Sequence, residues 1–187
     1  MHTFPNKTDE DLMASLAAGT LDASALLFRR YHRQLFNFYL RMGFDRATGE
    51  DMVQTVFERV IRYRHTYQPA TSFRTWMYRI ARNVQADNRR RQARMQDEAW
   101  QGPAEIAEPF EVPAQQTIEA AETLAQLEKA LQQLPETQLE ILLLTRYQGL
   151  KYAEVGELLG CSEGAVKLKV FRAIEQLRAI FLKLEKR

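Results

Sequence analysis

The sequence predicts an all-α protein made of two small helical domains joined by an acidic, flexible linker. Three observations lead to this prediction. Glycine is sparse, with 8 in 187 residues, no stretch alternates polar and apolar residues, and apolar residues recur at three- and four-residue steps. We expect the first domain at residues 1–94, the linker at 95–123 and the second domain at 124–187.

Charge divides the chain into a basic, an acidic and a second basic block. Residues 1–94 contain 16 Lys and Arg against 9 Asp and Glu, whereas residues 95–128 contain 8 acidic residues and no basic one. Residues 129–187 contain 10 basic and 7 acidic residues, and the net charge of the chain is +2. Two basic ends predict two contacts with a polyanion.

Four helices are expected in the first domain, at residues 9–18, 22–42, 48–64 and 72–91. Gly19 and Gly43 end the first two, the segment 65–71 with Pro69 is expected as a loop, and Ser72 can cap the fourth helix. Their apolar faces are expected to include Leu27, Tyr31, Leu35, Phe38, Met42, Met52, Val53, Val56, Phe57, Val60, Ile61, Phe73, Trp76, Met77, Ile80 and Val84.

The linker is defined by composition. Residues 95–116 contain one glycine and three prolines among acidic residues, which is typical of a mobile connection. Trp100 and Phe110 are not explained by disorder alone. Two interpretations stay open for them, docking on a partner and docking on the protein itself.

Helices are expected to resume at residues 117–133 and again after Pro135, ending at Gly149. The apolar residues expected to face inward in this pair are Leu124, Leu127, Leu131, Leu134, Leu139, Leu142, Leu143 and Tyr147.

Residues 152–177 predict a helix, a tight turn and a second helix. Gly160 suits the left-handed turn, and Ser162 can cap the second helix. That helix is expected to bury Val166, Val170, Ile174 and Leu177. Three basic residues fall outside this face: Lys167, Lys169 and Arg172. The pattern is typical of a helix-turn-helix, whose second helix enters the DNA major groove. An ordinary exposed helical hairpin is the alternative.

The stretch 72–94 is rich in arginine, with seven arginines and one acid, Asp87. Arginines hold phosphates, and aromatic residues such as Trp76 and Tyr78 can stack on unpaired bases. The alternative for Trp76 is a place in the core, which its helical alignment with Phe73 and Ile80 favours.

Other classes of function are disfavoured. Cys161 is the single cysteine, so no intramolecular disulfide forms, and a small buried residue is a better interpretation of it than a redox switch. No secretory signal and no membrane-spanning apolar run occurs, which indicates a soluble cytoplasmic protein. His2, His32 and His65 are scattered, so we expect no enzyme activity, no metal site and no cofactor.

Several segments of the sequence resemble the motifs of a known protein family. Residues 50–57 (EDMVQTVF) and 73–83 (FRTWMYRIARN) resemble region two of bacterial RNA polymerase sigma factors. Leu134-Pro135-Glu136 and the helix-turn-helix with residues 164–167 (GAVK) resemble region four. Their order, and a length under 200 residues, are similar to the extracytoplasmic-function (group IV) branch of the sigma-70 superfamily. The resemblance covers about residues 20–94 and 124–180.

The resemblance implies an alternative sigma factor with core RNA polymerase, promoter DNA and an anti-sigma factor or other regulator as partners. On the polymerase, the largest-subunit clamp and the flap are the implied contacts. The clamp would be bound by Glu50, Asp51, Gln54 and Phe57. The minus-ten element would be opened and held by Gln68, Thr71, Ser72, Arg79, Arg82, Asn83, Arg89, Arg90 and Arg91. The minus-thirty-five element would be read by Ser162, Glu163, Lys167, Lys169 and Arg172. The acidic linker would thread through the polymerase toward the RNA exit path.

Three departures from the family pattern carry expectations of their own. Thr48 replaces an acid, which gives the hypothesis that its phosphorylation restores the missing charge and switches the factor on. Gly156 stands where alanine is frequent, and we expect packing to tolerate either residue. Leu168 stands where many relatives have serine, which leaves the base preference open.

Two other functions compete with this one. A free-standing helix-turn-helix regulator would not need the arginine and aromatic residues of the first domain. A sigma-like decoy that binds only an anti-sigma protein would not need Lys167, Lys169 and Arg172.

Overall fold

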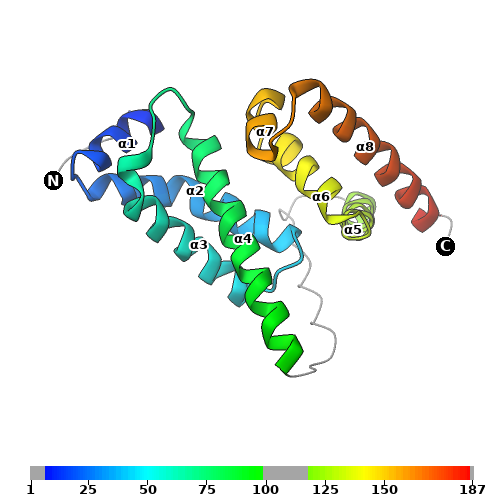
Figure 1. Ribbon diagram of the computed structural model, residues 1–187. Helices are drawn as coiled ribbons and strands as arrows, with labels where there is room; N and C mark the ends of the chain where they lie inside the picture. The colour runs from blue at the N-terminus through cyan, green and yellow to red at the C-terminus, as the bar shows by residue number, and fades with distance from the viewer. Residues whose placement is uncertain (1–6, 99–117, 186–187) are drawn as a thin grey trace. The chain divides into compact units, whose positions relative to one another are not determined.

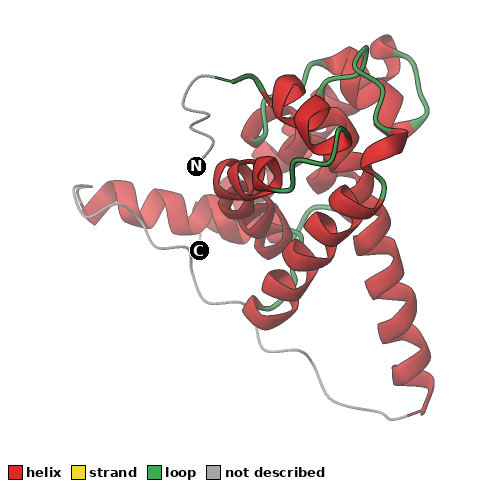
Figure 2. Ribbon diagram, turned by 90° about the vertical axis from the view of Figure 1, so that its left-hand side faces the viewer, coloured by secondary structure: helices red, strands yellow, loops and turns green. Residues whose placement is uncertain are grey.

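The computed structural model describes residues 7–98 and 118–185, and these residues form helices with no strand (Figure 2). The N-terminal elements are α1 (Asp9–Ala17), α2 (Asp22–Arg41), α3 (Arg46–Arg62), the 3₁₀ turn η1 (Arg64–Thr66) and α4 (Phe73–Glu98). The C-terminal elements are α5 (Ile118–Gln132), α6 (Glu136–Leu142), the π-helical turn η2 (Leu143–Tyr147), α7 (Tyr152–Leu159) and α8 (Glu163–Glu185). The all-α prediction is confirmed.

The chain divides into two compact units. One comprises Met1–Leu40 with Asp45–Glu105, and the other Ile106–Arg187 with Arg41–Phe44. Helical structure continues into the expected linker from both sides, because α4 extends to Glu98 and α5 begins at Ile118. Trp100 and Phe110 lie outside the described residues.

The first unit is built on α2, α3 and α4 (Figure 1). The ring of Phe38 meets those of Tyr39 and Tyr78 edge-on, each at 5.6 Å between centroids, and all three side chains are fully buried. The Tyr39 hydroxyl donates to the carbonyl of Ala81 at 3.0 Å, which satisfies a polar group in this core. The expected apolar faces are confirmed, Trp76 included, except that Ile61 is only half-buried.

Helix α1 ties the start of the chain to this core. The Asp9 carboxylate accepts hydrogen bonds from the Tyr31 hydroxyl and from the Arg30 guanidinium. Glu10 accepts from the backbone N–H of Phe73 at 3.2 Å, at the first residue of α4. A carboxylate at a helix N-terminus satisfies an orphan donor and complements the helix dipole, so α1 fixes where α4 begins.

An ion-paired carboxylate joins α3 to α4. The Asp87 carboxylate accepts from Arg59 of α3 at 2.8 Å and from Arg90 of its own helix at 2.5 Å. The hydrogen bond from Arg59, followed by that from Arg90, lowers the pKa of Asp87 below its ordinary value. The pair is partly exposed to solvent, so its contribution to stability is small.

In the second unit, α8 packs against α5, α6 and α7, as Figure 1 shows. The buried face of α8 consists of Val166, Val170 and Ala173. Ile174, which was expected on this face, is 38% exposed. The expectation for Tyr147 was also wrong, because the wider i→i+5 turn of η2 rotates this residue outward and leaves it 43% exposed.

The turn between α7 and α8 depends on two glycines. Gly160 adopts φ +65° and ends α7, and the Ser162 hydroxyl accepts from the N–H of Ala165 at 3.2 Å to cap α8. The backbone of Gly156 packs closely against the turn. A Cβ at this position would lie 2.6 Å from the carbonyl oxygen of Cys161. The expectation that alanine is tolerated at this position is therefore wrong.

We predict that Gly156→Ala destabilises the second unit by about 1–3 kcal/mol, the usual cost of overpacking against atoms that cannot move aside. Urea unfolding followed by circular dichroism measures the change. Gly164→Ala is the matched control, because a Cβ at Gly164 meets nothing within 4 Å. This control should be neutral or slightly stabilising. Equal stability of Gly156→Ala and the wild type would contradict the close approach at the turn.

A second prediction concerns the Arg59–Asp87 pair. A folded-state pKa that is lowered contributes stability above the unfolded pKa of about 4, and that contribution is lost as the pH falls through the folded pKa. A double-mutant cycle with Arg59→Gln and Asp87→Asn should give a coupling below about 1 kcal/mol at pH 7 that declines as the pH falls below about 4. A coupling that does not change with pH would show that the charge of Asp87 is not what joins the helices.

Candidate functional site

The arginines of α4 separate into two sets. Arg79, Asn83 and Arg90 are exposed and lie on one stripe of the helix, at spacings of four and seven residues. Arg82 and Arg89 are partly buried beside this stripe. Arg91 lies on another side, where it lines a groove between α3 and α4. The sequence placed all of these residues in one minus-ten surface, whereas the structure brings together only part of them.

The loop before α4 has a defined internal geometry. The Tyr67 hydroxyl donates to the carbonyl of Thr71 at 2.8 Å, and the Tyr67 ring meets Trp76 edge-on at 5.5 Å between centroids. Burial raises the pKa of Tyr67 to about 12, so the hydroxyl remains a donor at neutral pH. Ser72 accepts from the N–H of Thr75 as the cap of α4, and Gln68 is exposed. Of the three loop candidates, Gln68 is the most accessible.

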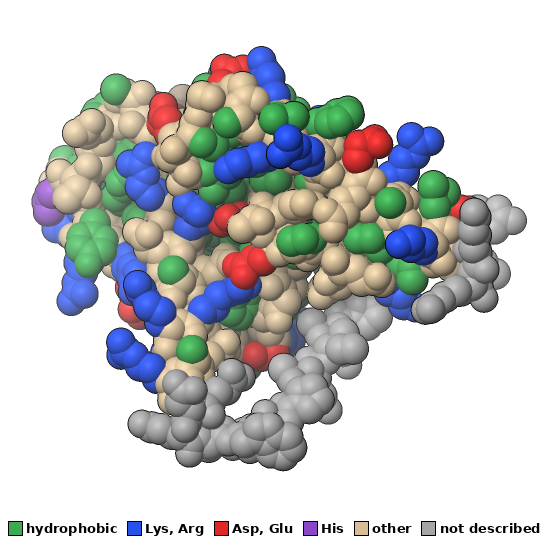
Figure 3. All heavy atoms as spheres, turned by 45° about the vertical axis from the view of Figure 1, so that its right-hand side comes forward, with side chains coloured by type: hydrophobic (Ala, Val, Ile, Leu, Met, Phe, Trp, Pro, Cys, Tyr) green, Lys and Arg blue, Asp and Glu red, His purple; other side chains and the backbone are tan. Residues whose placement is uncertain are grey.

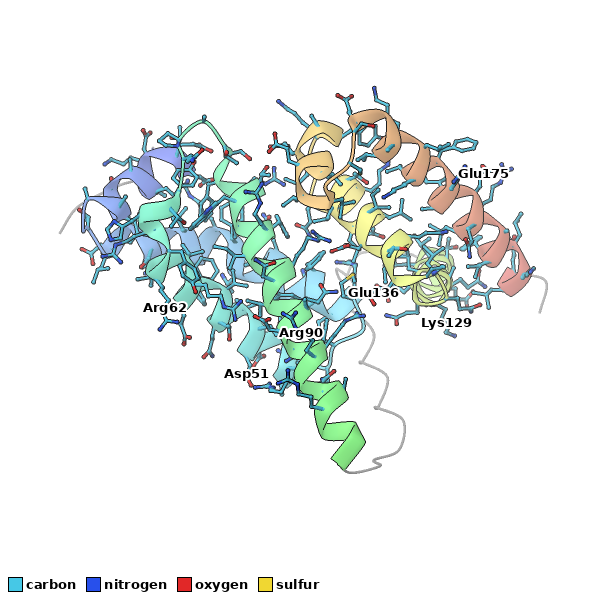
Figure 4. The ribbon with its side chains drawn as sticks, viewed as in Figure 1. Asp51, Arg62, Arg90, Lys129, Glu136 and Glu175 are labelled. Carbon is cyan, nitrogen blue, oxygen red and sulfur yellow. The ribbon has the colours of Figure 1, made fainter. Side chains whose placement is uncertain are left out.

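The groove between α3 and α4 has a volume of about 350 Å³. Asp51, Gln54 and Glu58 line it from α3, and Asn88 and Arg91 line it from α4. The side-chain amide oxygen of Asn88 (Oδ1) is buried without a hydrogen-bond partner among the described residues. Figure 4 labels Asp51 on α3 and Arg90 on α4, the two helices that form the walls.

The expected clamp-binding residues do not share one environment. Glu50, Asp51 and Gln54 are exposed on α3, and Glu50 forms an ion pair with Arg46 at 3.3 Å. Phe57 is only 6% exposed and packs edge-on against Phe28, with 4.9 Å between centroids. Phe57 therefore holds α3 in place, and its side chain is not available at the surface as the sequence prediction required.

Thr48 is part of the N-terminal cap of α3. Its backbone N–H donates to the Asp45 carboxylate at 2.9 Å, and its hydroxyl donates to the same carboxylate at 2.6 Å. The hydroxyl hydrogen bond is the largest cause of the lowered pKa of Asp45. A phosphate on Thr48 would replace this donor with acceptor oxygens beside a carboxylate, so phosphorylation would break the cap.

The outer side of α8 carries the expected basic residues. Lys167, Lys169 and Arg172 are exposed in the first half of the helix. The Lys167 ammonium lies 2.9 Å from Glu163, and this hydrogen bond raises the pKa of Lys167. Lys169 lies 4.0 Å from the half-buried sulfur of Cys161, which is less buried than expected. Figure 3 shows one face of the molecule, where Lys and Arg side chains are interleaved with hydrophobic ones.

Comparison with known proteins connects these surfaces to a family. The family model for Sigma-70 region 2 matches residues 27–95, and the model for Sigma-70, region 4 matches residues 124–177. The chain is 33% identical to the RNA polymerase sigma factor CarQ of Myxococcus xanthus, over 89% of this chain and 94% of CarQ. It is 30% identical to the ECF RNA polymerase sigma factor SigE of Mycolicibacterium smegmatis, over 91% of this chain and 68% of SigE.

The chain belongs to the extracytoplasmic-function RNA polymerase sigma factors. It is an alternative sigma factor, which binds core RNA polymerase and promoter DNA and directs promoter-specific initiation of transcription. Sigma factors in general are not enzymes. Family membership favours this function over a free-standing regulator or a decoy.

Two solved structures share the fold. CnrH, solved in complex with the cytosolic domain of CnrY, matches with a TM-score of 0.69 at 24% identity over 92% of this chain and 96% of CnrH. The sigma factor RpoE of Bartonella quintana, solved with the anti-sigma factor NepR, matches with a TM-score of 0.70 at 20% identity over 83% of this chain and 94% of RpoE. Among its described residues, this sigma factor has no helix with the length and hydropathy to cross a membrane.

Two apolar residues of this sigma factor were not among the DNA-binding candidates, although Leu168 was singled out for its bearing on base preference. Leu168 is 49% exposed and Phe171 is 62% exposed, on the side of α8 opposite to its buried face. The signal was present in the sequence, because both residues fall outside the stripe that Val166 and Val170 begin. Phe171 was overlooked because apolar residues are usually assigned to the core.

Proposed function

We propose that three exposed helical surfaces of this sigma factor each make a different binding contact. The first is the α3 surface of Glu50, Asp51 and Gln54, which would bind the clamp of the polymerase largest subunit. Acidic and amide side chains on an exposed face suit a partner rich in arginine. The observation that carries the proposal is the separation of these residues from the exposed stripe of Arg79, Asn83 and Arg90 on α4.

The first test is Gln54→Ala, which removes one exposed polar contact without disturbing the core. We predict that its affinity for core polymerase falls about two- to tenfold, the usual effect of one hydrogen bond. Fluorescence anisotropy of the labelled chain with purified core polymerase measures this. Gln34→Ala on α2 is the control, because it changes the same exposed residue type on another helix. Equal affinities for both variants would remove α3 from the clamp contact.

The second surface would engage the minus-ten element. Arg79, Asn83 and Arg90 on the exposed stripe of α4 would track the phosphates of the melted strand, and Gln68 would contact the edge of a flipped base. Thr71 and Ser72 support this contact through the loop that they shape. Arg82 and Arg89 would flank the stripe, and Arg91 would act at the α3–α4 groove, close to the clamp contact.

The third surface would read the minus-thirty-five element. Its residues are Ser162, Glu163, Lys167, Lys169 and Arg172. Support comes from the helix-turn-helix geometry, in which the N-terminal half of the second helix enters the major groove. The lysines and Arg172 lie where they can reach phosphates on both sides of that groove, and such contacts position the protein without specifying sequence.

The second test addresses these phosphate contacts. Lys169→Gln and Arg172→Gln in the full chain with core polymerase should each weaken promoter binding. Each should also reduce the slope of log K against log salt by about 0.9, the value for one lost phosphate contact. Lys183→Gln, in the last turn of α8, is the control. A slope unchanged in the first two variants would place α8 outside the DNA interface.

We also propose the organisation and setting of the chain. Residues 1–94 and 124–187 are the two functional domains, and residues 95–123 connect them inside the polymerase. The chain would act in the cytoplasm, where its polymerase works. An anti-sigma factor would hold it inactive, since RpoE of Bartonella quintana, which has the same fold, was solved in complex with the anti-sigma factor NepR. A regulatory phosphate on Thr48 remains a hypothesis, which carries the cost of a broken α3 cap.

A further inference from the structure

Helix α8 exposes an apolar pair in its N-terminal half. Phe171 is the most exposed large hydrophobic side chain among the described residues, at 62%, and Leu168 is 49% exposed. They are three residues apart, so their side chains are neighbours on the helix surface. Glu175, two turns after Leu168 on the same side, points away from α6 in Figure 4. The pair therefore faces away from the core of the second unit.

The surroundings of this pair favour DNA as its occupant. Lys167, Lys169 and Arg172 lie beside it and supply the positive charge that a nucleic acid requires. One turn before Leu168, Gly164 has open space where a Cβ would be, so nothing on this side obstructs the approach of the helix to a base edge. Two side chains are also far smaller than the roughly 800 Å² per partner that a stable protein interface buries.

The chemistry of the major groove then selects the base. Leucine and phenylalanine side chains neither donate nor accept hydrogen bonds, so they cannot read the polar edges of adenine, guanine or cytosine. The one apolar group that a base pair presents in this groove is the C5-methyl of thymine. Contact with that methyl removes apolar surface of both partners from water.

We propose that Leu168, with Phe171 beside it, reads thymine methyl groups in the upstream promoter element and so sets its base preference. This inference rests on the proposed role of α8 in that element. It adds a base-specific contact to the residues that bind phosphate.

The test uses deoxyuridine, which differs from thymidine only in lacking the methyl. Promoters are first selected from a library randomised upstream, with core polymerase and the full chain. Each thymine of the selected upstream element is then replaced by uracil in duplex DNA, and binding of the holoenzyme is measured. At one or two positions we expect a loss of about fourfold, the effect of exposing one methyl group.

Leu168→Ala should abolish the difference between thymine and uracil at one of these positions, and Phe171→Ala should reduce it there or at the next. Both side chains are exposed, so neither change disturbs the core. Leu182→Ala is the matched control, because Leu182 is 44% exposed on the same helix but lies about 21 Å further along it. It should retain the full difference between thymine and uracil.

Three outcomes would overturn the proposal. In the first, uracil has no effect at any position, or Leu168→Ala retains the difference, while Lys169→Gln and Arg172→Gln still weaken binding. The proposed contact of Leu168 with thymine methyl groups is then wrong, and the proposed role of α8 in binding the upstream element stands. In the second, none of these variants changes DNA binding, so the role of α8 fails as well. In the third, Leu168→Ala weakens binding to core polymerase without DNA, which makes the pair a protein contact.

Discussion

The close approach of Gly156 to the turn determines how the second unit presents α8. A backbone carbonyl occupies the space that a side chain would fill, so α7 and α8 can meet only at this distance. Their packing selects Val166, Val170 and Ala173 as the buried face of α8. Everything on the opposite face, cations and apolar side chains alike, is thereby directed outward. The contact at Gly156 thus helps to set which face of α8 is exposed.

In the first unit, ion pairs and aromatic packing set which sides of α3 and α4 are exposed. Arg59 and Asp87 join α3 to α4 at the surface, above a core of Phe38, Tyr39 and Tyr78. This arrangement leaves one side of α4 as an exposed basic stripe and turns a polar side of α3 to solvent. The proposed clamp contact on α3 and the proposed DNA contact of Arg79 and Arg90 on α4 would then use different side chains of one small domain.

Much of the fold follows from the sequence, because helical periodicity and capping residues act locally. Ser162, Gly160 and the buried faces of α2 to α4 were predictable for that reason. The exposure of Tyr147 was not predictable, since it depends on the π-helical turn η2. The exposure of Ile174 was not predictable either, since it depends on how α8 packs against its neighbours. The prediction that alanine fits at Gly156 was wrong, because the sequence does not show how closely the backbone at Cys161 approaches this residue. For the candidate site, the residue types and the burial of Phe57 were predictable, although that burial conflicts with the clamp-binding role also given to Phe57. The separation of Arg91 from the other arginines depends on tertiary packing.

The measurement that tests the central claim most directly is run-off transcription with purified bacterial core polymerase and fragmented genomic DNA. It is carried out with and without this sigma factor. The account predicts discrete transcripts that depend on the added chain, with start sites that share two upstream elements. Absence of new transcripts, together with failure of the chain to co-elute with core polymerase, would contradict it.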